Sequence, residues 1–133
     1  MANLCEKVGV DIKDISQGMG SDLRIGERFL RAGPAYGGSC FPKDTRALID
    51  TGKHFKTDLS IIKTVIALND KRTFLLINKF EEILHGKFKN KTITLLGVTF
   101  KPNTDDLREA SSLPIIKYLN QKTTNIRYYD TSG

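Results

Sequence analysis

The sequence has no tryptophan, only four prolines and only two cysteines. Cys5 and Cys40 lack the close spacing of metal ligands, which argues against a metal site and suggests a reducing, cytoplasmic setting. No apolar run approaches the roughly 20 residues of a membrane span, and we find no signal-peptide pattern, so we expect no membrane partner.

The length and charge of the chain narrow the class further. With 133 residues, 39% of them hydrophobic and 27% charged, the chain is long enough for one ordinary globular domain. The formal net charge is +6, but the lysines are scattered, without an arginine-rich run or interleaved aromatics. We therefore expect a small anionic ligand rather than nucleic acid.

The most informative stretch is glycine-rich and runs from residue 33 to residue 44. Gly33, Gly37 and Gly38 allow positive φ angles and let a ligand approach the main chain closely. Pro42 suits the first turn of a helix, where its missing N–H costs nothing. This pattern places Cys40 at or just before a helix N-terminus.

Two chemical interpretations of Cys40 are open on the residues alone. The free N–H groups and dipole of a helix N-terminus favour an anion, and Lys43 adds positive charge, so the thiol is expected to ionise readily. Asp44 offers a carboxylate within reach of a water beside the sulfur. The alternative is a glycine loop followed by a buried structural cysteine, because free cysteines are usually core residues.

The first half of the chain is predicted to be helical. Residues 2–8 form the tail of a helix with Cys5 in core packing, and Asp11 caps a second helix. The helix after Cys40 is expected to end near Gly52. A longer helix begins at Asp58 or Ser60 and runs to about Leu84. Its apolar positions cover more than one stripe, which favours a homodimer through this helix over burial within the chain alone.

From Lys91 the pattern changes to an α/β type. Residues 92–97 and 126–129 are predicted strands, and Ser111 or Ser112 caps a helix between them. This βαβ unit contains Gly97 but no G-x-G-x-x-G fingerprint. Because two strands are marginal alone, it is expected either to dock on the long helix or to pair its open edge with another chain. The predicted fold is a mostly α central domain, residues 1–88, followed by the opening βαβ unit of a doubly wound, Rossmann-like domain, residues 89–133.

Two blocks of sequence resemble a known family. Arg-Ile-Gly from Arg24, Phe-Leu-Arg-Ala-Gly from Phe29 and Tyr-Gly-Gly-Ser-Cys-Phe-Pro-Lys-Asp-Thr from Tyr36 resemble the catalytic-cysteine signature of UDP-glucose dehydrogenases, in the UDP-glucose/GDP-mannose dehydrogenase family. Residues 97–109, Gly-Val-Thr-Phe-Lys-Pro-Asn-Thr-Asp-Asp-Leu-Arg-Glu, resemble the first turn of their C-terminal nucleotide domain. Relatives acting on N-acetylated sugars usually have histidine before the cysteine. GDP-mannose relatives lack the Tyr-Gly-Gly-Ser-Cys-Phe-Pro motif.

The resemblance implies an activity. The family oxidises the CH₂OH of a sugar nucleotide, here UDP-glucose, to a carboxylate with two NAD⁺, through an aldehyde that a cysteine captures as a thiohemiacetal and then a thioester. It assigns Cys40 as the nucleophile and Asp44 to the water. Lys43 and Arg108 are expected near NAD.

The resemblance also implies a substrate site. Arg24 is expected to reach the neighbouring subunit's site, and further contacts are assigned to Phe29, Leu30, Arg31, Ala32, Gly33, Tyr36, Gly37, Phe41, Phe100 and Lys101. Without the motifs, Arg24, Lys101 and Arg108 would be ordinary surface charges. Ala35 stands where the family commonly has glycine, and its Cβ would crowd a positive φ or a ligand there.

Several parts of the family pattern are absent from this sequence. We find no glycine fingerprint of an N-terminal Rossmann domain and no helix with the family's catalytic lysine and asparagine. We therefore expect an internal fragment that is inactive alone. Two alternatives stay open: a dehydrogenase for another sugar nucleotide, GDP-mannose or a UDP-N-acetylhexosamine, and a non-catalytic dimerisation or nucleotide-binding module, which needs no reactive thiol.

Overall fold

The computed structural model describes residues 1–122 and 125–131, and these form two compact units. The first unit is Met1–Gly33 and the second is Pro34–Gly133, and each is described by itself. Helices dominate the chain up to residue 84, and a parallel pair of strands with one helix follows, which confirms the predicted fold class. Within the described ranges, no helix is long and apolar enough to cross a bilayer.

The first unit contains two short helices, α1 (Ala2–Val8) and α2 (Ile12–Gly20). α1 ends because Gly9 adopts a left-handed conformation with φ 73°, which costs a glycine little. Asp11 caps α2 as predicted, and its carboxylate accepts a hydrogen bond from the N–H of Lys13 at 2.9 Å. Cys5 is only 4% exposed, which confirms its place in the packing of this unit.

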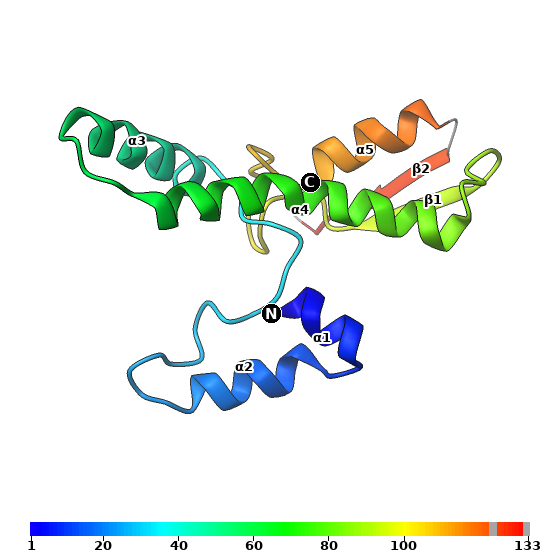
Figure 1. Cartoon of the computed structure of the whole chain (residues 1–133). Coiled ribbons are helices and arrows are strands. Elements are labelled where there is room, and N and C mark those ends of the chain that lie inside the picture. The colour runs from blue at the N-terminus through cyan, green and yellow to red at the C-terminus, as the bar shows by residue number, and fades with distance from the viewer. Residues whose placement is uncertain (123–124, 132–133) are drawn as a thin grey trace. The chain divides into compact units, whose positions relative to one another are not determined.

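In the second unit, α3 (Phe41–His54) lies alongside one half of the long helix α4 (Ser60–Leu84), as Figure 1 shows. The predicted end of α3 near Gly52 was wrong, because the helix continues for two more residues. Gly52 is instead buried where the chain turns back: a Cβ there would lie 2.7 Å from Cδ1 of Leu59. The glycine is therefore required by close packing rather than by a helix terminus.

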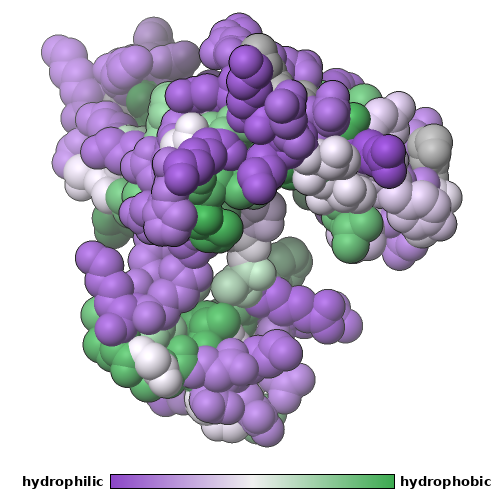
Figure 2. All heavy atoms as spheres, turned by 90° about the vertical axis from the view of Figure 1, so that its right-hand side faces the viewer, coloured by the Kyte–Doolittle hydropathy of each residue, from purple (hydrophilic) through white to green (hydrophobic). Residues whose placement is uncertain are grey.

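The helix α4 has the predicted bounds, and none of its 25 residues is buried. Its large exposed apolar side chains are Ile61, Val65, Leu68, Phe74, Leu75 and Ile83. Hydrophobic surface is visible among the hydrophilic surface of the chain in Figure 2. Within this chain, α3 and the following α/β segment cover only part of the helix.

The α/β segment comprises β1 (Thr92–Leu96), α5 (Ser112–Gln121) and β2 (Asn125–Tyr129). The strands are parallel, and Thr92 pairs with Asn125 in the first register position. Ser111 is the N-cap residue of α5 as predicted, but its side chain makes no capping hydrogen bond. The hydroxyl of Ser112 instead donates to the carbonyl of Val98, which ties the start of α5 to the loop after β1.

The best-buried cluster joins this segment to α4, as expected for a two-stranded sheet that is marginal alone. Phe88, Ile115 and Leu119 are 3%, 7% and 0% exposed. Apolar side chains of α4 and of both strands pack against them: Leu76, Ile77, Phe80, Leu84, Ile93 and Ile126. The boundary between residues 1–88 and 89–133 stays a prediction.

Candidate functional site

The loop before α3 packs tightly on the segment after β1. Gly38 has φ 84°, and a Cβ there would lie 2.7 Å from the ring of Phe100. A Cβ at Gly37 would lie 2.3 Å from the carbonyl oxygen of Glu109. The N–H of Gly38 also donates to the carbonyl of Arg108 at 2.8 Å. Gly38 is thus needed for its positive φ and Gly37 for the close approach of Glu109, whereas Gly33 and Gly37 do not use the positive φ that glycine allows.

Cys40 is the N-cap residue of α3 and its side chain is exposed, so the alternative of a buried structural cysteine was wrong. Its carbonyl accepts a hydrogen bond from the N–H of Asp44 at 2.8 Å, which begins the helix. The hydroxyl of Ser39 lies 3.6 Å from the sulfur. The thiol therefore stands open to solvent at the amino-terminal end of a 14-residue helix.

Two cations lie within electrostatic reach of this sulfur. The Lys43 ammonium is 2.8 Å from the Asp44 carboxylate, and this hydrogen-bonded ion pair raises the pKa of Lys43, with a smaller contribution from the Cys40 thiolate. Hydrogen bonds to Asp106 raise the pKa of Arg108, and the Cys40 thiolate again adds to the shift. Lys43 and Arg108 thus interact electrostatically with the Cys40 thiolate, and Asp44 forms its ion pair with Lys43 in the first turn of α3.

Asp106 holds Arg108 in place, and the sequence analysis missed it. Its Oδ1 accepts hydrogen bonds from the backbone N–H and Nε of Arg108 at 2.8 and 2.9 Å, and its Oδ2 accepts one from Nη2 at 2.9 Å. The same bonds lower the pKa of Asp106. The Asp-x-Arg spacing was the available signal, since a carboxylate two residues before an arginine can bind both its backbone and its fork.

Asn69 was also missed, and it binds Tyr36 in the loop before α3. On α4, its Oδ1 accepts from the N–H of Tyr36 at 2.9 Å and its Nδ2 donates to the carbonyl of Tyr36 at 3.1 Å. The Tyr36 ring meets that of Phe41 edge to face, with centroids 4.7 Å apart. The signal was an amide among half-buried apolar residues of one helix face.

Phe100 and Lys101 follow β1 and line a cavity of about 670 Å³ at the carboxyl ends of the two strands. The ammonium of Lys101 lies 5.4 Å from the centre of the Phe100 ring. Asp130, directly after β2, accepts hydrogen bonds from the N–H groups of Val98 and Thr99 at 2.8 and 3.3 Å. Ligands of open α/β sheets bind at this edge, so the position of Phe100 and Lys101 suits a ligand contact.

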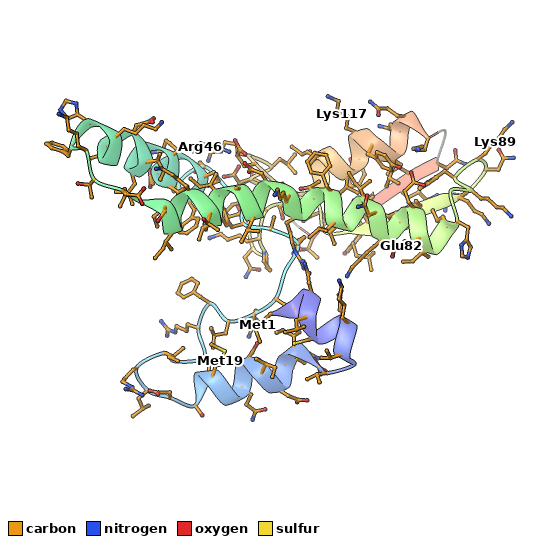
Figure 3. The ribbon with its side chains drawn as sticks, in the orientation of Figure 1. Met1, Met19, Arg46, Glu82, Lys89 and Lys117 are labelled. Atoms are coloured by element: carbon orange, nitrogen blue, oxygen red, sulfur yellow. The ribbon has the colours of Figure 1, made fainter. Side chains whose placement is uncertain are left out.

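Another cavity, of about 580 Å³, is lined by residues of α3, α4 and α5 and by the loop before α3. Tyr36, Asn69, Phe74 and Tyr118 are among its lining residues. Figure 3 labels two charged residues that also line it, Arg46 on α3 and Lys117 on α5. Arg46 lies 3.3 Å from the carboxylate of Glu109, which links α3 to the segment before α5.

The remaining predicted substrate residues belong to the first unit. Arg24 forms a bidentate ion pair with Asp22 at 2.6 and 3.0 Å, and Phe29 is fully exposed with φ 65°. Leu30, Arg31 and Ala32 line a cavity of about 670 Å³ in this unit, which ends at Gly33.

Ala35, the departure from the family wording, is not among the residues with positive φ, so its Cβ causes no backbone conflict. The described ranges contain no group of three or more His, Cys, Asp or Glu residues that could hold a metal ion.

Comparison with known proteins places two regions of the chain. Residues 1–71 match the UDP-glucose/GDP-mannose dehydrogenase family, central domain, and residues 94–133 match the UDP-binding domain of the same family. The chain is 48% identical over 130 residues to the UDP-glucose 6-dehydrogenase YwqF of Bacillus subtilis, covering 98% of this chain and 29% of that protein. It is 47% identical to the UDP-glucose 6-dehydrogenase of Rickettsia bellii, covering 100% of this chain and 31% of that protein.

A solved structure of a UDP-glucose dehydrogenase is also similar to this chain. The UDP-glucose dehydrogenase of Pyrobaculum islandicum matches with a TM-score of 0.86 at 34% identity, over 95% of this chain and 29% of that one. The chain spans about 30% of the length of the curated relatives it matches. The two family matches, in the order central domain and UDP-binding domain, show that the chain belongs to the UDP-glucose/GDP-mannose dehydrogenase family.

Proposed function

We propose that this chain is the catalytic-cysteine segment of an NAD-dependent UDP-glucose 6-dehydrogenase, which oxidises UDP-glucose to UDP-glucuronate. The observation that carries the proposal is the exposed thiol of Cys40 at the N-terminus of α3, which interacts electrostatically with Lys43 and Arg108. A non-catalytic module has no need of this arrangement. The names of the relatives support UDP-glucose over other sugar nucleotides.

Cys40 acts as the nucleophile in this proposal. Its thiolate adds to the carbon of the sugar aldehyde, the aldehyde oxygen takes a proton, and a thiohemiacetal forms. Loss of a hydride from that carbon, for which NAD⁺ would be the acceptor, together with loss of the hydroxyl proton, leaves a thioester on Sγ. Water then attacks the thioester carbonyl, the C–S bond breaks, and the acid leaves with Cys40 restored. Asp44, one turn along α3, positions or activates this water.

The residues for NAD are only partly within this chain. Lys43 and Arg108 are cations beside Cys40 and suit the edge of a dinucleotide site. NAD supplies the acceptor for hydride. The sequence has no G-x-G-x-x-G to cradle the pyrophosphate, so we propose that these 133 residues do not turn over by themselves.

For the substrate, we assign the nucleotide contacts to Phe100 and Lys101. They line the cavity at the carboxyl ends of β1 and β2, within the segment that matches a UDP-binding domain. Tyr36, Gly37 and Phe41 are assigned to the sugar-nucleotide pocket beside Cys40. Within the first unit, residues 29–33 are proposed as further substrate contacts, and Arg24 is proposed to bind substrate in the neighbouring subunit's site.

We further propose a homodimer through α4. A 25-residue helix without one buried residue, and with six large apolar side chains exposed, needs a cover that this chain does not provide. Burial of such side chains contributes roughly 1.5–3 kcal/mol each, which favours association. Both cysteines are free thiols, which supports a reducing, cytoplasmic setting.

A chimera tests the proposed substrate. The matching segment of the Bacillus subtilis relative is replaced by this chain, and NADH formation is followed at 340 nm with UDP-glucose, UDP-N-acetylmannosamine and GDP-mannose. We expect activity with UDP-glucose and at least tenfold less with the other two. Preference for either other sugar nucleotide would assign the chain to a different branch, and a folded chimera with no activity on any would contradict a catalytic role. The unmodified relative is the control.

A further inference from the structure

We infer that Asn69 is a positioning residue for Cys40, acting through the backbone of Tyr36. The inference rests on the proposed role of Cys40. Asn69 belongs to α4, whereas Tyr36 and Cys40 belong to the loop that leads into α3. A side chain that binds both polar groups of one distant residue fixes the position and orientation of that residue.

The hydrogen bonds have the required geometry. The Asn69 amide accepts from the Tyr36 N–H at 2.9 Å and donates to the Tyr36 carbonyl at 3.1 Å, and both bonds are partly buried. A side-chain amide carries a donor and an acceptor in one plane, so it can bind the N–H and the C=O of a single residue at the same time. Leucine offers neither group, so only the amide makes both bonds.

The loop between Tyr36 and Cys40 is short, and two of its residues are glycines. Gly37 and Gly38 follow Tyr36, and glycine has the largest backbone freedom to lose. At Gly38, the loop is held by the hydrogen bond from its N–H to the Arg108 carbonyl. Tyr36 also contacts the ring of Phe41, the residue after Cys40. Asn69 thus binds the loop at Tyr36, and the Arg108 carbonyl binds it at Gly38.

The placement of Asn69 on α4 is consistent with this role. Ile62, Ile66, Thr73 and Leu76 are half-buried like Asn69 and recur with it at helical spacing. Asparagine is a poor helix former, and an apolar residue would extend this stripe at lower cost. The amide is therefore explained by its bonds to the loop rather than by helix formation.

The test uses the chain as it is and two alkylating reagents, with adducts at Cys40 mapped by mass spectrometry. Iodoacetate is anionic and iodoacetamide is neutral, so their rate ratio reports how close the cations Lys43 and Arg108 lie to the sulfur. Hydrogen exchange of the Gly38 amide reports whether the loop keeps its structure, and exchange of the α4 amides reports whether the chain stays folded.

The variants are Asn69→Leu, which removes both bonds, and Asn69→Gln, which restores an amide. Asn78→Leu, at an exposed asparagine of α4, is the matched control.

We expect Asn69→Leu to lower the iodoacetate-to-iodoacetamide ratio by at least about twofold, since displacing the sulfur by a few ångströms weakens a Coulomb interaction by that order. Its Gly38 amide exchanges at least tenfold faster, Asn69→Gln recovers part of both effects, and Asn78→Leu behaves as the unmodified chain. An unchanged ratio, no recovery in Asn69→Gln, or loss of α4 protection in Asn69→Leu would overturn the inference. Neither reagent needs a nucleotide, so such a failure leaves the proposed dehydrogenase function untouched, and failure of that function leaves this result standing.

Discussion

The two cysteines of this chain have opposite surroundings. Cys5 packs inside the first unit at 4% exposure, whereas Cys40 is open to solvent at a helix N-terminus. The two residues themselves do not differ, so the residue type alone does not show which thiol is buried. The distinction came from glycine and proline around Cys40, which restrict the backbone in a way that can be read locally.

Alkylation distinguishes the two thiols. With substoichiometric iodoacetamide at neutral pH, we expect adducts at Cys40 in large excess over Cys5, because the reagent cannot reach a buried sulfur. Mass spectrometry of tryptic peptides gives the two yields. Denatured protein, in which both thiols are open, is the control. Preferential labelling of Cys5 in the folded chain would contradict the assignment.

Asp106 gives a prediction on pH. Hydrogen bonds from Arg108 hold its pKa below the ordinary value of 3.8, so its contribution to stability is present above that value and is lost as the pH falls through the lower, folded-state pKa. Asp106→Asn removes this contribution. The urea midpoint of the unmodified chain should therefore exceed that of Asp106→Asn near neutral pH, and the difference should shrink as the pH falls below 3.8.

The lowered pKa values of Asp22 and Asp58 do not confuse this comparison, because both chains contain these groups and their effects cancel in the difference. A difference that stays constant from pH 7 to the acid end would mean that Asp106 acts through packing rather than charge.

At the scale of elements, local signals were sufficient wherever periodicity and capping determine the outcome. The apolar spacing of residues 60–84 and the cap at Asp11 predicted α4 and the start of α2 correctly. Gly52 was misread, because its contact with Leu59 depends on how the chain turns after the helix. Asn69 was missed for a similar reason, since its partner Tyr36 lies 33 residues away.

The close contact between the cysteine loop and Phe100 can be measured with a pair of glycine substitutions. Gly38 and Gly97 have φ values of 84° and 89°, so alanine at either position incurs a similar backbone strain of about 1–2 kcal/mol. Only at Gly38 would the new Cβ also meet the Phe100 ring, at 2.7 Å, while at Gly97 nothing lies within 4 Å.

We therefore expect Gly38→Ala to lower the free energy of unfolding by roughly 1–3 kcal/mol more than Gly97→Ala, the usual cost of overpacking. Denaturant unfolding of both variants gives the two values. Equal losses would show that the loop does not lie against Phe100.

At the scale of the whole molecule, the sequence resemblance predicted the family, and both domain matches confirm it. Within the second unit, the surroundings of Cys40 depend on tertiary contacts of its loop with the segment 100–109, which no local pattern encodes. The bonds between Asp106 and Arg108 are local by contrast, and their signal was the Asp-x-Arg spacing.

The exposed apolar side chains of α4 predict self-association. Size-exclusion chromatography with light scattering at tens of micromolar should give twice the mass of the chain. Leu68→Glu, at a side chain 61% exposed on α4, should shift the population to monomer because a carboxylate is costly to bury. Lys71→Glu, at an exposed polar position of the same helix, is the control. A clean monomer for the unmodified chain would refute the proposed dimer.

The most direct measurement is the product formed by the Bacillus subtilis chimera carrying Cys40→Ser, with UDP-glucose and NAD⁺ in excess. We predict that the chimera with Cys40 forms UDP-glucuronate with two NADH per sugar oxidised, and that the Cys40→Ser chimera forms no UDP-glucuronate although it remains folded. Chromatography of the nucleotide sugars quantifies the acid. UDP-glucuronate from the Cys40→Ser chimera at the rate of its parent would contradict the role of Cys40 as the nucleophile.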